Sequence, residues 1–180
     1  MTLHADPVAR WERRVADLVD LFSTIARTRM AGVPVLNAAL RVEAIGFEPP
    51  AADDGAAVAA GVGILITPWF MNLVRLPMRC EDAVDGVGRT ERHALGGEVF
   101  DFIGAHEPAI GAFSACSLFS PMFEFADQAA ARATALAVLG TLRATPESTA
   151  IVAAPSSPGE PLPVRRSFLF GRSAVRVAAS

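Results

Sequence analysis

The sequence predicts an α+β fold. The expected architecture is a two-layer sandwich, in which a mostly antiparallel sheet of about five or six strands carries an N-terminal and a C-terminal helix on one face. Two observations support this prediction. Strand-like segments are grouped between two segments with helical periodicity. Most of these strand segments are joined by short connections, which favour antiparallel neighbours.

The first helix is predicted over residues 7–30. Asp6 and Pro7 suit its start, because an aspartate accepts hydrogen bonds from the first helical N–H groups and proline fits the first helical position. Apolar side chains then recur at steps of three and four residues and form one stripe, at Trp11, Val15, Leu18, Phe22 and Ile25. Gly32 marks the end of the helix.

Six segments are strand candidates, at residues 40–47, 61–67, 71–76, 89–95, 98–103 and 111–118. The first alternates apolar and charged side chains at its start, as a half-buried strand does. The second, GVGILIT, carries apolar residues on both faces. Pro68 and Pro77 end the second and third segments, and Gly96 with Gly97 predicts a hairpin turn between the fourth and fifth.

A second helix is predicted over residues 125–143, with Leu136, Leu139 and Leu142 at its apolar edge. Two parts of the chain are therefore expected, a folded domain over residues 1–146 and a tail over residues 147–180. The tail begins with a stretch rich in proline, serine, glycine and alanine, which is typical of a linker or a loosely ordered segment.

Composition excludes several functional classes. The net charge of −3 comes with no basic stripe, so no nucleic-acid partner is expected. Cys80 and Cys116 form no CxxC motif, which excludes an intrachain zinc ribbon or rubredoxin-type iron site, and we expect no cofactor. Two isolated thiols fit either buried free cysteines or ligands of a passing metal fragment. The longest apolar run is about half of the roughly 20 residues that span a bilayer.

The N-terminus has no basic region followed by an apolar stretch, so a signal peptide is not expected. We therefore predict a cytoplasmic protein without stable membrane insertion. Hydrophobic residues make up 52% of the chain, more than an ordinary soluble domain contains. This surplus suggests that some apolar surface faces a partner.

Three stretches resemble the HybE/HupJ/HoxT family of [NiFe]-hydrogenase assembly proteins. They are GVPVLN at residues 32–37 running into LRVEAIGF at 40–47, GILITPWFMNL at 63–73, and SLFSPMFEFADQ at 117–128. The likeness covers residues 7–145. It implies a two-layer α+β sandwich and a chaperone that holds precursors of the small subunit, the large subunit or both until their metal clusters are in place.

The same resemblance implies that the chaperone prevents premature twin-arginine export of the small subunit. Some members of the family carry a fused rubredoxin domain, which the missing CxxC excludes here. Any redox protection would then come from a separate rubredoxin-like accessory protein.

The second and third stretches are the predicted partner-binding site, with candidate residues Trp69, Phe70, Met71, Asn72, Phe119, Pro121, Met122, Phe123 and Glu124. Aromatic and methionine side chains bury much area, and methionine adapts to imperfect shapes. Neither helical nor strand periodicity can place all apolar residues of 119–125 on one face, so some must point outward. The alternative is core packing for Trp69 and Phe70, and a helix N-cap at Ser120.

The tail contains a further candidate. Arg165, Arg166 and Phe168 form the R-R-x-F-L pattern of a twin-arginine export signal, at the wrong end of the chain and with no long apolar stretch after it. One hypothesis is mimicry, in which the tail occupies the site meant for the client's signal until the client displaces it. The alternative is a mobile basic tail with an apolar end.

We expect no enzyme activity, because the histidines have no metal-ligand spacing and the serines no nucleophile-elbow context. A second function of another class stays open, namely a small ligand-binding or catalytic α+β domain with a pocket near Trp69. Acid–base chemistry would then fall to Glu98, Asp101 and His106, if they met at neighbouring strand ends. An enclosed cavity lined by these residues would favour that alternative, and a shallow apolar surface would favour the chaperone.

Overall fold

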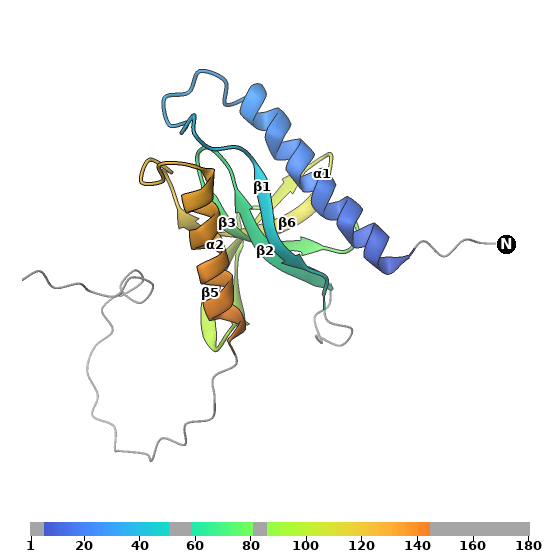
Figure 1. The fold of residues 1–180 in the computed structure, drawn as a ribbon. Helices are drawn as coiled ribbons and strands as arrows, with labels where there is room; N and C mark the ends of the chain where they lie inside the picture. Colours follow the sequence, from blue (N-terminus) through green and yellow to red (C-terminus); the bar gives the residue numbers. More distant parts are fainter. Residues whose placement is uncertain (1–5, 51–58, 81–85, 145–180) are drawn as a thin grey trace, which may run out of the picture. The chain divides into compact units, whose positions relative to one another are not determined.

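The computed structural model describes residues 6–50, 59–80 and 86–144. In chain order these residues form α1 (Pro7–Arg27), β1 (Glu43–Glu48), β2 (Ala60–Ile66), β3 (Met71–Pro77), β4 (Thr90–Leu95), β5 (Glu98–Glu107), β6 (Gly111–Phe119) and α2 (Gln128–Arg143) (Figure 1). The strands build one antiparallel sheet in the order β1-β2-β3-β6-β5-β4. The predicted α+β class and antiparallel sheet are confirmed. The predicted tail over residues 147–180 lies outside the described residues.

The two helices begin at aspartate caps. Oδ1 of Asp6 accepts a hydrogen bond of 3.0 Å from the backbone N–H of Val8, as predicted for α1. For α2 the cap is Asp127, which accepts from the N–H of Ala130 at 2.8 Å. The helix therefore begins at residue 128 rather than at 125, and Ser120 is not its cap. The first helix ends at residue 27, three residues before the predicted end.

The two helices lie on opposite faces of the sheet, so their predicted placement on one face is wrong. Side chains of Ile64 and Ile66 in β2 pack in the cluster that contains α2, whereas Leu65 between them packs in the cluster that contains α1. Successive side chains of a strand point to opposite faces. Figure 1 accordingly shows α1 and α2 on opposite sides of β1 and β2. The physical reason is that β2 is apolar on both faces, and both faces need cover from water.

A row of small side chains lets α2 lie close to the sheet. The residues of α2 that are buried are Ala131, Ala135, Val138 and Leu139. The predicted edge residue Leu136 instead is 52% exposed. Gly46 of β1 has a φ of 56° and leaves no room for a Cβ atom beside Leu139. Any other residue at position 46 would be strained by this positive φ, and its Cβ atom would press on the side chain of Leu139.

On the other face, α1 is fixed by a buried arginine and by ring packing. The guanidinium of Arg14 donates to the carbonyl oxygens of Pro77 at 3.2 Å and Ile110 at 2.9 Å. After the helix, Arg29 forms two hydrogen bonds of 2.8 Å with the carboxylate of Glu107. This contact holds the pKa of Glu107 below its ordinary value. The whole length of α1 is therefore tied to the sheet and to the β5–β6 hairpin.

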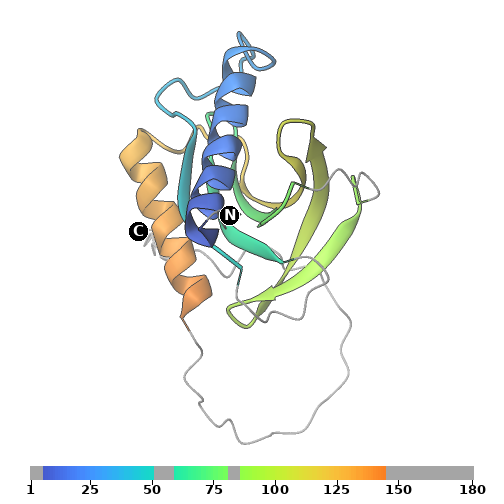
Figure 2. The same ribbon diagram turned by 90° about the vertical axis from the view of Figure 1, so that its right-hand side faces the viewer.

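The sheet curves around α2. The predicted hairpin turn at Gly96 and Gly97 joins β4 to β5, and Gly96 approaches the backbone of Leu142 so closely that no Cβ atom fits. The last turn of α2 also lies beside β1, where Arg143 donates to the carbonyl oxygen of Gly46. The face that carries α2 is therefore concave, and Figure 2 shows α2 beside the sheet from a second direction. Among the described residues, no helix combines the length and apolar character that crossing a membrane requires.

Candidate protein-binding surface

The three stretches that carry the family resemblance meet at one end of the sheet. The segment 32–37 after α1, the turn 67–70 between β2 and β3, and the loop 120–127 between β6 and α2 are joined by hydrogen bonds and strand pairing. We call this region the junction surface. Sequence alone did not reveal this convergence, because the three stretches are tens of residues apart.

Asn37 joins the three segments directly. Its backbone N–H donates to the carbonyl oxygen of Pro68 at 2.8 Å. Its side-chain amide donates to the carbonyl oxygens of Met122 at 3.0 Å and Phe125 at 2.7 Å. Its Oδ1 accepts from the N–H of Ala39 at 3.0 Å. One half-buried side chain thus satisfies two backbone oxygens of an irregular loop, which would otherwise be costly to bury.

The turn 67–70 is held by the buried hydroxyl of Thr67. This Oγ1 accepts from the N–H of Phe70 at 2.9 Å and the N–H of Trp69 at 3.3 Å, and it lies 3.0 Å from the carbonyl oxygen of Phe70. The N–H of Thr67 also donates to that oxygen at 2.8 Å. Because the turn closes on its own polar groups, the rings of Trp69 and Phe70 are fixed at the end of the hairpin.

The loop 120–127 lies beside this turn because β3 pairs with β6. Met71 faces Phe119 at the end of that pairing, so both strands leave the sheet together. The hydroxyl of Ser120 then donates to the carbonyl oxygen of Trp69 at 3.4 Å. The ring of Phe119 packs edge-on against Phe125, with ring centroids 5.1 Å apart. The loop is therefore shaped by packing on one side and by Asn37 on the other.

The start of α2 is tied to the strand that follows segment 32–37. Glu43 of β1 accepts from Gln128 at 2.7 Å and forms an ion pair of 2.8 Å with Arg132. The side-chain oxygen of Gln128 accepts in turn from the N–H of Arg41 at 2.9 Å. These contacts fix the helix end that follows the loop against β1 and the residues before it.

The predicted partner-binding residues divide by exposure. Phe123 is 60% exposed, and Pro121 and Glu124 beside it are exposed as well. Met71 and Met122 are fully buried in the core, so in this structure they support the surface from below and cannot touch a partner. The remaining four, Trp69, Phe70, Asn72 and Phe119, are half-buried. The tail candidates Arg165, Arg166 and Phe168 lie outside the described residues.

Trp69 and Phe70 have both a core side and an outer side. The ring of Phe22 from α1 packs against both of them, at centroid distances of 6.5 Å and 5.6 Å. Core packing, the alternative that the sequence left open for Trp69 and Phe70, therefore applies to part of each ring, and the remaining part faces solvent. Asn72 follows them, and its Oδ1 is buried without a hydrogen-bond partner among the described residues.

The exposed part of the junction surface combines the apolar ring of Phe123 with acidic side chains. Phe123 lies between the buried side chains of Met122 and Phe125, which fix the backbone that carries it. Glu124 and Asp127 supply carboxylates on the same loop. Aromatic anchors with a polar rim are typical of protein interfaces. Sequence reasoning missed Asn37, because an asparagine in a loop has many local roles.

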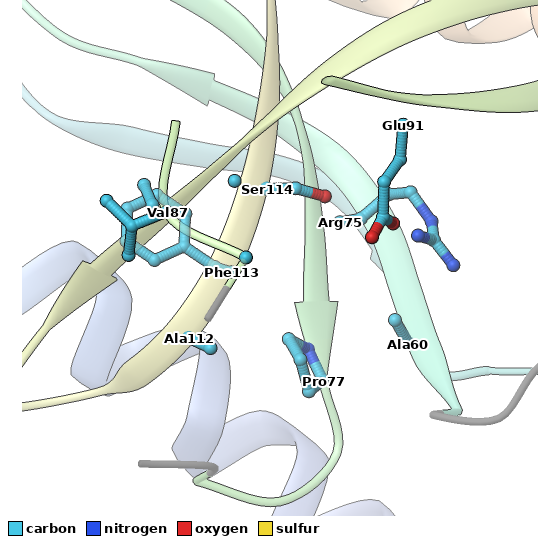
Figure 3. Close-up of a pocket in the computed structure, with 11 residues that line it drawn as sticks. Ala60, Arg75, Pro77, Val87, Glu91, Ala112, Phe113 and Ser114 are labelled. Atoms are coloured by element: carbon cyan, nitrogen blue, oxygen red, sulfur yellow. The ribbon is translucent and has the colours of Figure 1, made fainter. Parts of the chain in front are cut away.

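A cavity of about 200 Å³ lies at the opposite end of the β2–β3 hairpin. Figure 3 shows Arg75 and Glu91 on one side of it, and Val87 and Phe113 on the other. Ala60 and Pro77, which also line it, pair at the end of the hairpin away from the turn 67–70, about 20 Å along the strands. The cavity is therefore not the pocket near Trp69 that the alternative function requires.

The three candidate acid–base residues do not meet. Glu98, Asp101 and His106 all lie on β5, and strand alternation places Asp101 on the face opposite to His106. Asp101 instead pairs with Arg92 at 3.6 Å, and none of the three lines the cavity. The condition that the alternative function sets, a meeting at neighbouring strand ends, is therefore not met, because all three residues lie on one strand.

The two cysteines are free, Cys80 exposed and Cys116 half-buried. Burial, together with the nearby charge of Asp101, raises the pKa of the Cys116 thiol. A protonated thiol is a poor metal ligand. Within residues 6–50, 59–80 and 86–144, no group of three or more histidine, cysteine or acidic side chains is arranged to hold a metal ion.

Comparison with known proteins gives a consistent result. The family described as "[NiFe]-hydrogenase assembly, chaperone, HybE" matches residues 13–171. Protein HoxT of Cupriavidus necator is 51% identical over 166 residues, which cover 88% of this chain and 89% of that protein. The hydrogenase expression/formation protein HupJ of Bradyrhizobium diazoefficiens is 38% identical over 154 residues, covering 86% and 85%.

Two further matches differ in extent. The chain spans 45% of the protein named probable rubredoxin HupJ from Rhodobacter capsulatus, at 35% identity. The solution structure of HybE from Escherichia coli superposes with a TM-score of 0.51 at 20% identity, and the match covers 89% of this chain and 91% of that one. At this identity the superposition shows a shared fold.

Replacing Asn37 by Asp should destabilise the protein. The carboxylate keeps the shape of the side chain but cannot donate to the carbonyl oxygens of Met122 and Phe125. We expect the free energy of unfolding in urea to fall by about 2–4 kcal/mol, the cost of leaving buried polar groups unpaired. The control is Ala38→Asp, which adds the same charge at the exposed neighbour. Equal losses in both variants would show that Asn37 does not hold the segments together.

Proposed function

This chain belongs to the HybE family of [NiFe]-hydrogenase assembly chaperones, and we propose that it binds hydrogenase subunit precursors through the junction surface. One observation carries the proposal. The three stretches that resemble the family meet at one end of the fold and present Phe123, 60% exposed, above a buried core. A large exposed aromatic side chain on a rigid support is a suitable anchor for another protein.

The construction of the surface suits a client that must be released. Only part of the aromatic cluster is exposed, since Trp69 and Phe70 also pack on Phe22. A small contact area of this kind gives a weak or transient complex rather than a permanent one. A rigid loop adds affinity without an ordering cost. The client then binds at a preformed site and leaves once its metal clusters are complete.

The acidic residues of the loop favour a client segment that is basic and apolar. Glu124 directly follows Phe123 and Asp127 caps α2 four residues after it, and opposite charges near an interface accelerate association and select partners. The twin-arginine export signal of a small-subunit precursor has this character. We therefore propose that binding delays export, that it takes place in the cytoplasm, and that the client is the small-subunit precursor, the large-subunit precursor or both.

A rubredoxin-like accessory protein is a further proposed partner. The Rhodobacter capsulatus relative named as a probable rubredoxin is matched over 45% of its length. This chain contains no CxxC motif. We propose that a separate rubredoxin-like protein supplies any rubredoxin-type iron site that assembly needs.

The alternative of a ligand-binding or catalytic domain has less support. It requires a cavity near Trp69, and the cavity described above lies at the other end of the β2–β3 hairpin. The chaperone proposal requires an exposed apolar surface in the stretches that resemble the family, and the junction surface supplies one. We therefore keep the chaperone as the proposed function.

Changing Phe123 to Ala should weaken client capture. The tagged protein would be recovered from cells that express the hydrogenase operon, and precursors would be quantified by mass spectrometry. Losing an aromatic anchor should reduce recovered precursor by about tenfold or more. The matched control is Val99→Ala, because Val99 is equally exposed, at 59%, and lies on β5 far from the loop.

Two results of that experiment would contradict the proposal. The first is equal recovery of precursor by the Phe123→Ala variant and the unchanged protein. The second is recovery of neither precursor by the unchanged protein, combined with normal hydrogenase assembly in a strain that lacks it. Circular dichroism of both variants checks that the fold is kept.

We also propose that Arg165, Arg166 and Phe168 mimic the client's export signal. The family match extends to residue 171 and therefore includes this segment. Deleting residues 164–180 should tighten binding of a peptide that carries the client's twin-arginine signal, measured by fluorescence anisotropy. Unchanged or weaker binding after the deletion would exclude the mimicry.

A further inference from the structure

Asn72 carries a buried acceptor that the fold does not use. Its Oδ1 is buried and has no hydrogen-bond partner among the described residues. Buried polar atoms in folded proteins are nearly always paired, and an unpaired one destabilises the fold because its hydration is lost without replacement. Leucine has the same branched shape as asparagine and would avoid this cost. Asn72 therefore lowers stability at its own position, which points to a role outside the fold.

This residue lies where the cover of α1 over the sheet ends. The cross-strand neighbours of Asn72 are Leu65 of β2 and Ser117 of β6. Directly opposite residues of antiparallel strands share a face of the sheet, so all three lie on the α1 side. Leu65 is fully buried in the cluster that contains α1, whereas Ser117 is exposed. A molecule that contacts Ser117 is therefore next to the amide of Asn72.

A β-bulge links this position to the junction surface. Asn72 pairs with Ser117, whereas Met71 pairs with Phe119, so Leu118 is the extra residue of β6. Bulges are common next to functional sites, where they redirect side chains. Here the bulge lets Phe119 pack in the cluster on the α2 side while Ser117 stays on the α1 side. The open sheet beside Asn72 thus adjoins the junction surface.

The surroundings of the unpaired oxygen favour a cationic donor. The half-buried rings of Trp69 and Phe70 precede Asn72 in the chain, and ring faces attract cations. The register of β5 against β6 places Asp101 opposite Ser117, on the same face of the sheet. Asp101 contributes a carboxylate to this area and is not required as a direct partner. A charged donor also forms a stronger hydrogen bond than a neutral one.

We propose that Oδ1 of Asn72 accepts a hydrogen bond from a basic side chain of the client, an arginine or a lysine. This inference rests on the proposed function, because the client is the precursor bound at the junction surface. Asn72 as a whole is half-buried, so rotation of its amide brings the oxygen to the surface. The basic group lies over Ser117, and the oxygen gains the partner that the free protein does not provide. Asn72 thus selects clients with a basic group near the residues that contact Phe123.

Two substitutions separate this role from a structural one. Asn72→Leu removes the acceptor and the unpaired atom together, so the unfolding equilibrium constant in urea should fall by about fivefold. Recovery of precursor with the tagged protein should also fall, by about fivefold or more, because the client loses a charge-assisted hydrogen bond. Asn72→Asp keeps an acceptor and adds a negative charge, so it should destabilise the free protein and keep or raise the recovery. A residue needed only for folding would move stability and recovery in the same direction.

The control is Thr90→Leu, which adds a leucine at an exposed position of the edge strand β4 and should leave recovery unchanged. Recovery is compared at a temperature at which circular dichroism shows all variants folded. Lower stability of Asn72→Leu, or full recovery by it, would overturn the inference. Loss of recovery by Asn72→Asp would do the same, because an ionised aspartate accepts hydrogen bonds and cannot donate them.

The Phe123→Ala variant distinguishes this inference from the proposed function. If Phe123→Ala lowers recovery and Asn72→Leu does not, the role of Asn72 is wrong and the junction surface stands. If neither variant lowers recovery, both proposals are wrong. A loss in both variants, with Asn72→Leu more stable than the unchanged protein, is the result that we expect.

Discussion

Asn37 makes the contacts on which the shape of the junction surface depends. A single amide group donates to two carbonyl oxygens of the loop 120–127, while the backbone of the same residue donates to Pro68 in the turn 67–70. Irregular segments carry backbone groups that the sheet cannot pair, and burying them unpaired costs about 1–3 kcal/mol each. Asn37 removes that cost for two oxygens, which allows Met122 and Phe125 to point inward and Phe123 to point outward.

The sheet provides the support for this arrangement, because it is covered on both faces. The α1 side holds Trp69 and Phe70 against Phe22, and the α2 side holds Met71 and Met122 in the core. Buried residues of the two motif strings therefore anchor the exposed ones. The opposite end of the β2–β3 hairpin is different, since the cavity there is lined by both apolar and polar residues, among them Arg75 and Glu91.

Much of the fold follows from local patterns in the sequence. The stripe from Trp11 to Ile25, the cap at Asp6 and the hairpin at Gly96 and Gly97 each depend on neighbours along the chain, and each prediction holds. The placement of both helices on one face failed, although GVGILIT already showed apolar residues on both faces of a strand. Both apolar faces of such a strand must be covered from water, which requires a helix on each side of the sheet.

The site was predictable in part. The strings TPWF and SPMF identified the segments, and the crowding of apolar residues at 119–125 required that some point outward, as Phe123 does. Which methionines would be buried depended on the pairing of β3 with β6, and the role of Asn37 depended on a contact 85 residues along the chain.

Hydrogen exchange of the full chain with and without an unprocessed hydrogenase precursor tests the central claim most directly. Protection gained in residues 67–70 and 120–127 is predicted, and protection confined to the cavity around Arg75 and Glu91 would contradict it.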